Sequence, residues 1–379
     1  MHEAVDRLEA ARASSSTAEF YKVMHAALTS AIKVIARADD SSGIIGHACR
    51  RLLAIHPDAA VVAGVPAPRL VEWMIGFQFD GEVDYFELDP VAYAPALGDH
   101  GLRSYRARLD NIRAGLTPMS AGTESWQVPD RHERFVLDSN DQRLAVLDLD
   151  IDAIIRTHGR DRKVAAWIED TARAFEEIGE IDLAIDWAKQ AADHDRGHQA
   201  LHAADYWCQL LTRHRPDKLL SARQEVFRHW PTSTTAAHLH QAAGTAWAEL
   251  EPDVFATLTR DPRQTVIFTL HHLKNPTLAW QQAHQLGLDD DRTWADLVTA
   301  YDPIDPTATL PIHRRLVEHD LANTGAQHYQ HAARRLARMR HIATTTDQLA
   351  EIDTYIAELR DLHRRRPRLQ HEFDKAQLP

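Results

Sequence analysis

The chain has 379 residues, of which 44% are hydrophobic and 26% charged, a composition typical of globular rather than disordered proteins. Its formal net charge of −12 repels nucleic acid and anionic membranes on average, so binding to either would need a local basic patch. The two cysteines, Cys49 and Cys208, are too few and too distant for a disulfide-rich secreted domain or a cysteine zinc ribbon within one chain.

The N-terminal residues and the hydropathy of the chain bear on its location. Residues 1–7 begin an amphipathic helix and lack the basic-then-apolar plan of a signal peptide. No stretch approaches the roughly 18 uncharged apolar residues of a membrane span. By elimination we expect a soluble, cytoplasmic protein without a membrane partner.

Residues 1–116 are predicted to form an irregular block of helices. Glycine is scarce, with 15 in all, and apolar residues recur every three or four positions, as in a stripe of Phe20, Met24 and Leu28. Five helices are predicted in this block. The first covers 17–36, and the second runs from the turn at 39–43 to just before His56-Pro57. The third begins at Pro68, the fourth runs from Asp89-Pro90 to Gly98, and the fifth covers 102–116.

Residues 117–130 are the predicted linker, because Pro118, Gly122 and Pro129 interrupt any apolar periodicity. From 131 to 379 the spacing predicts helix pairs. The pairs are 162–178 with 181–193, 198–213 with 218–229, 233–243 with 247–258, 262–273 with 276–286, a looser pair over 291–322, and 325–342 with 345–362. Corresponding alanines of the first two pairs lie 38 residues apart, close to the tetratricopeptide period of about 34. The predicted fold is therefore all-α, an irregular block followed by a tetratricopeptide-like α-solenoid.

Several stretches of the chain carry a family resemblance. They are Ala172-Arg173-Ala174-Phe175-Glu176-Glu177-Ile178-Gly179-Glu180-Ile181-Asp182-Leu183-Ala184, Thr277-Leu278-Ala279-Trp280, Ala333-Arg334-Arg335-Leu336 through Ala357-Glu358-Leu359-Arg360, and His363-Arg364-Arg365-Arg366-Pro367-Arg368. With them, the chain from about Thr17 onward resembles the helical region that follows the zinc finger in bacterial SWIM-zinc-finger proteins of uncharacterised function. The resemblance implies an interaction scaffold.

The zinc finger of those proteins has no counterpart in this sequence. It needs a Cys-x-Cys … Cys-x-His set, because structural zinc takes four ligands in a tetrahedron. Cys49 and Cys208 cannot supply that set. We therefore expect no metal, and whatever the finger does for the resembling proteins is not carried over.

An apolar run that ends in Asp148 and Asp150 is similar to the nucleophile strand of haloacid-dehalogenase-type phosphatases. In that family a carboxylate attacks phosphorus beside Mg²⁺. The Thr or Val expected two places after the second Asp is missing here, and so is a parallel βαβ frame. We expect instead a helix that ends near Leu147 and another that is capped by Asp150 or Asp152.

His194, His198 and His202 recur every four residues, with Asp205 close behind. Two histidines four positions apart on one helix face can chelate zinc. Gly197 is expected to break the helix between the first two, and no glutamate beside His198 completes a HExxH motif. We expect a polar helix start, with a metal site at His198, His202 and Asp205 as the alternative.

Arginine is concentrated towards the end of the sequence. Residues 313–371 hold 11 arginines, no lysine and 7 acidic residues, whereas the whole chain carries −12. The candidate partner-binding residues are Arg334, Arg335, Arg338, Arg340, Arg364, Arg365, Arg366 and Arg368. They form either a patch for phosphate or an acidic partner, or a solvated helix face whose charges pair with Glu318, Glu351 and Glu358.

These patterns favour a non-enzymatic helical-repeat scaffold, without catalytic residues or cofactor, whose concave surface binds a protein or peptide partner. The alternative is a nucleic-acid-associated regulator that uses the Arg-rich face, with binding that weakens steeply as salt rises. A distant alternative is a divalent-metal phosphohydrolase at Asp148 and Asp150.

Overall fold

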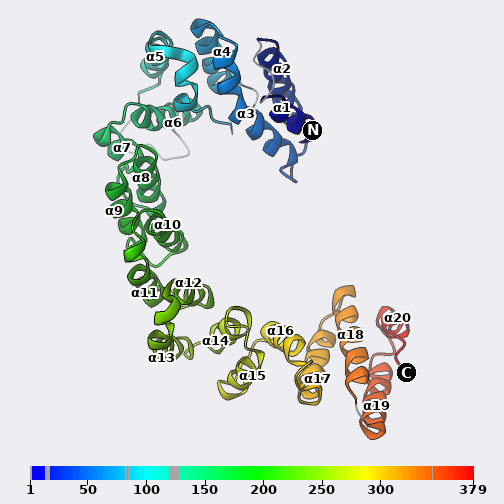
Figure 1. Cartoon of the computed structure of the whole chain (residues 1–379). Helices are drawn as coiled ribbons and strands as arrows, with labels where there is room; N and C mark the ends of the chain where they lie inside the picture. The colour runs from blue at the N-terminus through cyan, green and yellow to red at the C-terminus, as the bar shows by residue number, and fades with distance from the viewer. Residues whose placement is uncertain (1, 13–17, 82, 84–85, 119–127, 344) are drawn as a thin grey trace. The chain divides into compact units, whose positions relative to one another are not determined.

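The structure, a computed structural model, describes residues 2–12, 18–81, 83, 86–118, 128–343 and 345–379. Over these residues the chain is all-α, with 79% in helices, no strand, and successive helices packed in pairs (Figure 1). The predicted all-α, solenoid-like fold class is confirmed, and the tetratricopeptide-like repeat stays a prediction. None of the described helices is both long and apolar enough to span a membrane.

The chain forms two compact units, residues 1–210 and residues 211–379, and the limit between them falls inside α10 (His198–His214). We call them the first and the second unit and describe each by itself. The domain limits from the sequence, 1–116 and 131–379 with a linker at 117–130, stay a prediction. Most of that linker, residues 119–127, lies outside the described residues.

In the first unit most helices pack mainly against a neighbour in sequence, although the first helix packs against the third. The helices are α1 (His2–Arg12), α2 (Ala18–Ile35), α3 (Ile44–Val62), α4 (Ala67–Phe79), α5 (Pro90–Gly115), α6 (Arg131–Leu147), α7 (Ile151–His158), α8 (Ala165–Glu177), α9 (Ile181–Ala192) and the start of α10. Such pairing of consecutive helices is typical of an α-solenoid.

In the second unit most helices also pack against a neighbour in sequence, although the last one packs against the helix two before it. Its helices after α10 are α11 (Leu219–His229), α12 (Ser233–Ala243), α13 (Trp247–Leu258), α14 (Pro262–Ile267), η4 (Phe268–His272), α15 (Pro276–Gln285), α16 (Asp291–Tyr301), α17 (Pro306–Ala322), α18 (Ala326–Ile342), α19 (Thr346–Leu362) and α20 (Pro367–Lys375). Helices α12 and α13 have the limits predicted from the sequence.

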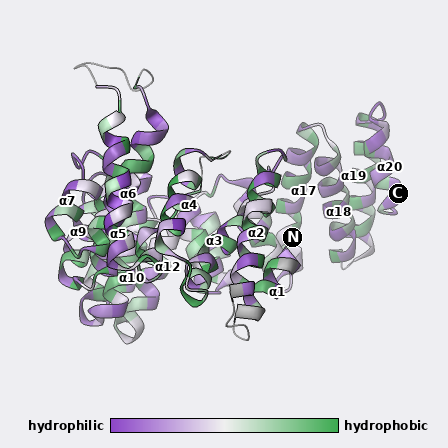
Figure 2. Ribbon diagram, turned by 90° about the horizontal axis from the view of Figure 1, so that it is seen from above, coloured by the Kyte–Doolittle hydropathy of each residue, from purple (hydrophilic) through white to green (hydrophobic). Residues whose placement is uncertain are grey.

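Four helices begin with an Asp or Asn cap that is followed by Pro. Asp89, Asp261, Asn275 and Asp305 each accept a hydrogen bond from a backbone N–H of the first turn, and a proline follows each of them. The carboxylate or amide oxygen satisfies a donor that the helix leaves unpaired, and proline has no N–H to lose at the first helical position. Hydrophobic and hydrophilic residues are interspersed along the helices labelled in Figure 2.

Helix α3 differs from the prediction at its C-terminal end. The residue before a proline disfavours helix, which predicted a stop before His56-Pro57, but α3 continues through Pro57 to Val62. His56, Pro57, Ala59 and Ala60 are all buried in this last part of the helix. Their burial offsets the hydrogen bond that proline removes.

A glycine interrupts α5, as predicted. Gly98 has φ 58° and ψ 178°, a conformation that is not helical and that a side chain would strain. The two parts of α5 flank it, and Tyr93, Leu97 and Tyr105 are buried on either side.

Helix α18 buries one face and leaves the other for polar residues. Tyr329, Ala332, Ala333, Leu336 and Met339 are buried in a core shared with α17, α19 and α20. The three- and four-residue spacing puts these side chains on one stripe. The polar residues of α18 are therefore turned away from that core.

Candidate functional site

A cavity of about 430 Å³ lies in the second unit between α16, α17 and α18. Its volume is within the range of about 300–1,000 Å³ that small-molecule pockets occupy. Polar and charged side chains form most of its wall. They are Asp296, Asp302, His313, His331, Arg334, Arg335 and Arg338.

The three arginines of the wall come from one side of α18. Arg334 and Arg338 are four residues apart and Arg335 and Arg338 three apart, so all three lie on adjacent turns of one face. His331 is one turn before them on the same side. The helical spacing noted in the sequence thus places three of the eight candidate arginines in one cavity.

Asp302, the C-cap residue of α16, is a buried carboxylate that receives three donors. The Thr309 hydroxyl donates to it at 2.6 Å, Arg338 Nε at 2.8 Å and His313 Nε2 at 3.2 Å. Burial alone would raise the pKa of Asp302, but these hydrogen bonds outweigh it and the pKa is lowered. Asp302 is therefore an anion that fixes the position of both Arg338 and His313.

His313 is 4% exposed and neutral near pH 7, because burial lowers its pKa more than the nearby Asp302 raises it. In the neutral ring one nitrogen carries the proton. The carboxylate of Asp302 accepts from Nε2, so Nδ1 is left as an acceptor. No described residue donates a hydrogen bond to Nδ1.

Arg335 is held by a second buried carboxylate, Asp320. Arg335 Nε lies 3.3 Å from Asp320 Oδ2, and the rings of His328 and His331 lie 3.6 and 4.0 Å from Oδ1. Arg335 and Arg338 each use only Nε for their carboxylates among the described residues. Their terminal Nη atoms are available to a ligand.

Arg334 differs from its two neighbours because it pairs with no carboxylate of the described residues. Its Nε donates to the backbone oxygen of Gln330 at 3.3 Å, and the side chain is exposed at the rim of the cavity. A guanidinium without a counter-ion at a cavity lined by two further guanidinium groups favours an anionic ligand.

The other five candidate arginines do not line this cavity. Arg340 points to another side of α18 and pairs with Asp353 of α19 at 2.6 Å. Arg364 pairs with Asp361 at 3.1 Å, and Arg366 donates to the backbone oxygen of Leu321 at 2.8 Å. The remaining two, Arg365 and Arg368, are exposed.

Four of the candidate arginines, Arg335, Arg338, Arg340 and Arg364, pair with aspartates rather than with the glutamates 318, 351 and 358 that the solvated-face interpretation predicted. Asp302 and Asp320 are buried, so the pairs that they form are fixed parts of the fold rather than exposed ion pairs.

The paired aspartates at 148 and 150 lie at a junction between helices. Helix α6 ends at Leu147, as predicted, and Asp150 caps α7 by accepting from Ala153 N at 2.9 Å. Asp148 pairs with Arg106 of α5 at 2.7 Å. Both carboxylates thus have structural partners, and no strand carries them in the part of the chain that the structure describes.

The histidines near the start of α10 are not gathered into one site among the described residues. Helix α10 begins at His198, as the polar helix start predicted. His202 Nδ1 lies 2.9 Å from Oε2 of the buried Glu169 of α8. His194 contacts Asp195 and the backbone oxygen of Arg162 instead.

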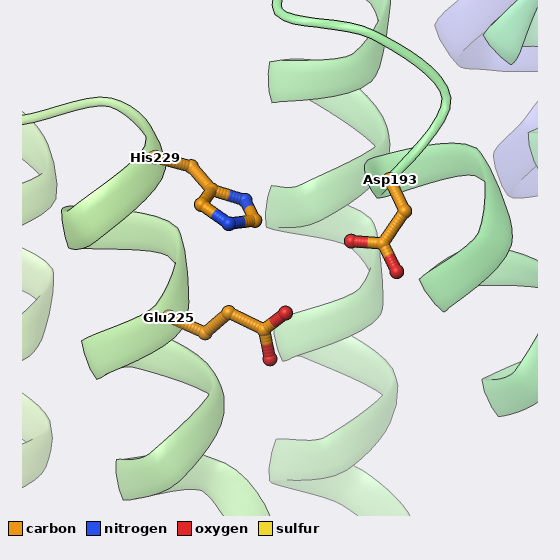
Figure 3. Close-up of side chains that lie close together, drawn as sticks. All are labelled: Asp193, Glu225 and His229. Carbon is orange, nitrogen blue, oxygen red and sulfur yellow. The ribbon is translucent and has the colours of Figure 1, made fainter.

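A further pair of possible ligands lies on α11. Glu225 and His229 are one turn apart and project from the same side of the helix (Figure 3). Asp193, also drawn there, pairs with Lys189 of α9 at 2.6 Å. Because Asp193 belongs to the first unit and the other two to the second, we assign no cation site to them.

Sequence analysis did not identify Asp302 and His313 as candidate functional residues. Neither belongs to a recognisable motif. The only signal was local, since Thr309 and His313 are four residues apart on α17 and follow the acidic end of α16.

Comparison with known proteins identifies a family, but the function of that family is unknown. A model described as a family of unknown function (DUF6880) matches residues 4–369. None of the curated proteins matches the sequence.

Proposed function

Since the chain belongs to this family of unknown function, we propose its function from the geometry of the second unit. It is a non-enzymatic binding protein that holds an anionic side chain of a protein partner in the cavity between α16, α17 and α18. The observation that carries the proposal is a set of three arginines on one wall. Two are held by buried carboxylates, and the third has no carboxylate partner among the described residues.

Preorganisation makes this cavity suited to binding. Asp302 accepts from Nε of Arg338, and Asp320 accepts from Nε of Arg335. The Nη atoms of both arginines are therefore positioned before a ligand arrives. Binding an anion then costs less conformational entropy than at flexible surface arginines, because these arginine side chains are already ordered. Pairs of packed helices are a common frame for such binding surfaces, and the resemblance to the helical region of SWIM-zinc-finger proteins supports an interaction scaffold.

Nucleic-acid binding through the Arg-rich face is the weaker alternative. Arg335, Arg338, Arg340 and Arg364 have carboxylate partners, which reduces the positive charge that a phosphate backbone would meet. The charge of −12 on the whole chain opposes the approach of nucleic acid as well.

Fluorescence anisotropy with the full chain tests the proposal. The probes are labelled peptides of one sequence in which a central residue is Glu, phosphoserine or Gln. We expect the two anionic peptides to bind and the Gln peptide not to. Arg334→Glu should weaken the binding by about tenfold or more, which corresponds to about 1.4 kcal/mol.

Arg368→Glu is the matched control, because Arg368 is also an exposed arginine of the second unit and lies outside the cavity. It should change the affinity less than twofold. Equal losses in the two variants would indicate only a change in overall charge and would contradict the proposal. Tight, steeply salt-dependent binding of a labelled DNA duplex without peptide binding would favour the nucleic-acid alternative.

A further inference from the structure

A second cavity of about 430 Å³ lies in the first unit, between α3, α5 and the segment that precedes α5. Helices α3 and α5 pack against each other. Most of the cavity wall is apolar and includes the buried residues Pro57, Phe86, Leu88 and Tyr93. Small-molecule sites typically have volumes of about 300–1,000 Å³ and are mostly apolar with a few polar groups. The cavity has both properties.

Three charged side chains complete the wall, and they belong to Arg50, Glu87 and Asp89. The charge of Asp89 is compensated, because Arg143 donates to its two carboxylate oxygens at 2.9 and 3.0 Å. Arg50 and Glu87 are exposed, and they form no ion pair with each other or with another described residue. The Ser139 hydroxyl, which carries no charge, donates to Glu87 at 2.6 Å. The wall therefore offers one cation and one anion to a ligand.

These two charges come from different elements. Arg50, Leu53 and Pro57 recur every three or four residues, so they share one face of α3. Glu87 belongs to the segment before α5, where its neighbours Phe86 and Leu88 are buried. A ligand that pairs with both charged groups must therefore contact α3 and the segment before α5 in the same, largely apolar cavity.

We propose that this cavity binds a zwitterion with an apolar body, namely a free apolar amino acid or dipeptide. The α-carboxylate of the ligand pairs with the Arg50 guanidinium, and its α-ammonium group pairs with the Glu87 carboxylate. A guanidinium can bind a carboxylate through two parallel hydrogen bonds. The apolar side chains of the ligand cover the apolar wall, and the area that they remove from water favours binding. No covalent bond forms or breaks.

The two charges of the wall separate this ligand from simpler ones. An apolar carboxylic acid would pair with Arg50 and leave Glu87 without a counter-ion. An apolar amine would pair with Glu87 and leave Arg50 without one. A peptide segment inside a longer chain carries no charge on its backbone. A zwitterion compensates both side chains at once, and its apolar body matches the rest of the wall.

Isothermal titration calorimetry with the full chain tests the proposal at about pH 6.5. The amino group of a peptide, with a pKa of about 7.7–8.0, is protonated there. The probes are the dipeptide Leu-Phe, its N-acetyl form, its C-terminal amide and the form blocked at both ends. We expect Leu-Phe to bind at least tenfold more tightly than either singly blocked form. Equal affinities of Leu-Phe and the doubly blocked form would overturn the proposal and would indicate a segment inside a longer peptide as the occupant.

Two variants assign the ends of the ligand. Arg50→Gln should lose the preference for Leu-Phe over its amide and keep the preference over the N-acetyl form. Glu87→Gln should do the reverse, and its amide oxygen can still accept from Ser139. Arg103→Gln and Glu72→Gln replace exposed charges of the first unit outside the cavity, so these controls should change the affinity less than twofold. If Arg50→Gln and Glu87→Gln weakened all four probes by one common factor, these residues would not recognise the ends and the proposal would fall.

Two further probes test the apolar body and the size of the ligand. Gly-Gly has both charged ends and no apolar side chain, so we expect it to bind at least tenfold more weakly than Leu-Phe; equal affinities would contradict an apolar site. Free L-phenylalanine that binds as tightly as Leu-Phe would identify a single amino acid as the ligand, and weaker binding would identify a dipeptide. If neither phenylalanine nor Leu-Phe binds, the proposal is wrong, and the function proposed for the second unit is unaffected.

Discussion

Buried polar side chains join three helices of the first unit. Tyr105 Oη of α5 donates to Asn140 Oδ1 of α6 at 2.6 Å, and Gln78 Nε2 of α4 donates to the same Oη at 2.8 Å. Asn140 Nδ2 donates back to Gln78 Oε1 at 3.0 Å. Each of the three side chains is hydrogen-bonded to the other two, so the bonds form a closed ring. Burial raises the pKa of Tyr105 to about 12.

We expect Asn140→Ala to lower the free energy of unfolding by about 2–4 kcal/mol, because it leaves the Tyr105 hydroxyl and Gln78 Oε1 buried without this partner. Urea unfolding followed by circular dichroism measures the loss. Ser139→Ala is the control on the same helix, since it removes one exposed hydrogen bond to Glu87 and should cost less than about 0.5 kcal/mol. Similar midpoints for the two variants would contradict a structural role for the ring.

Buried histidines make the stability of the first unit depend on pH. Burial lowers the pKa of His56 to about 3 and that of His158 to about 4, from a usual value of 6.5. His56 donates or accepts with Tyr93 at 2.9 Å and His25 at 3.0 Å, and it stacks on Trp73. Below pH 6.5 the unfolded chain takes up protons that the folded chain excludes, so acid favours unfolding.

The free energy of unfolding should therefore be at its full value above about pH 6.5 and fall by about 1.4 kcal/mol per pH unit for each such histidine as the pH drops towards 4. His56→Gln should reduce that slope by the contribution of one histidine, about 1.4 kcal/mol per pH unit. Urea midpoints at successive pH values measure it, with His100→Gln, an exposed position, as control. An unchanged slope in His56→Gln would show that His56 does not carry the effect.

At the scale of elements, α20 covers the core of the second unit. Leu369 and Phe373 of this helix are fully buried in the cluster that contains Leu336 of α18 and Ile356 of α19. Arg360 of α19 lies over the Phe373 ring at 5.4 Å. The residues of α20 follow an Arg-rich stretch in the sequence, and no helix was predicted from them.

Phe373→Ala should lower the stability of the second unit by about 3–5 kcal/mol, because it opens a cavity under α20. Hydrogen exchange of peptides from 325–379 measures the effect in the intact chain. Arg368→Ala, on the exposed side of the same helix, is the control and should leave exchange nearly unchanged. Unaltered exchange in Phe373→Ala would mean that α20 does not stabilise this core.

At the scale of the whole molecule, charge is organised by pairing rather than by segregation. The chain carries −12 in all, yet residues 313–371 hold 11 arginines and 7 acidic residues. Several of these arginines are neutralised by aspartates, including Asp302, which lies outside that segment. What distinguishes the α16–α18 cavity is therefore the donors left unused after pairing, not the arginine content of the segment.

The sequence by itself determined the helical class, most helix limits and the stripe that Arg334, Arg335 and Arg338 share. Caps and apolar periodicity act within a few residues, so they can be recognised without knowing what the helix packs against. The same local rules were wrong at Pro57 inside α3, where packing decides, and no helix was predicted over the residues of α20.

Only the tertiary structure decided which of these arginines line one cavity. Asp302 is 36 residues from Arg338, and Asp320 is 15 residues from Arg335, so helical spacing could not pair them. The burial of His313 also depends on how α16, α17 and α18 pack. Burial lowers the pKa of His313, and the donors that reach Asp302 lower the pKa of that carboxyl; no stretch of sequence specifies either environment alone.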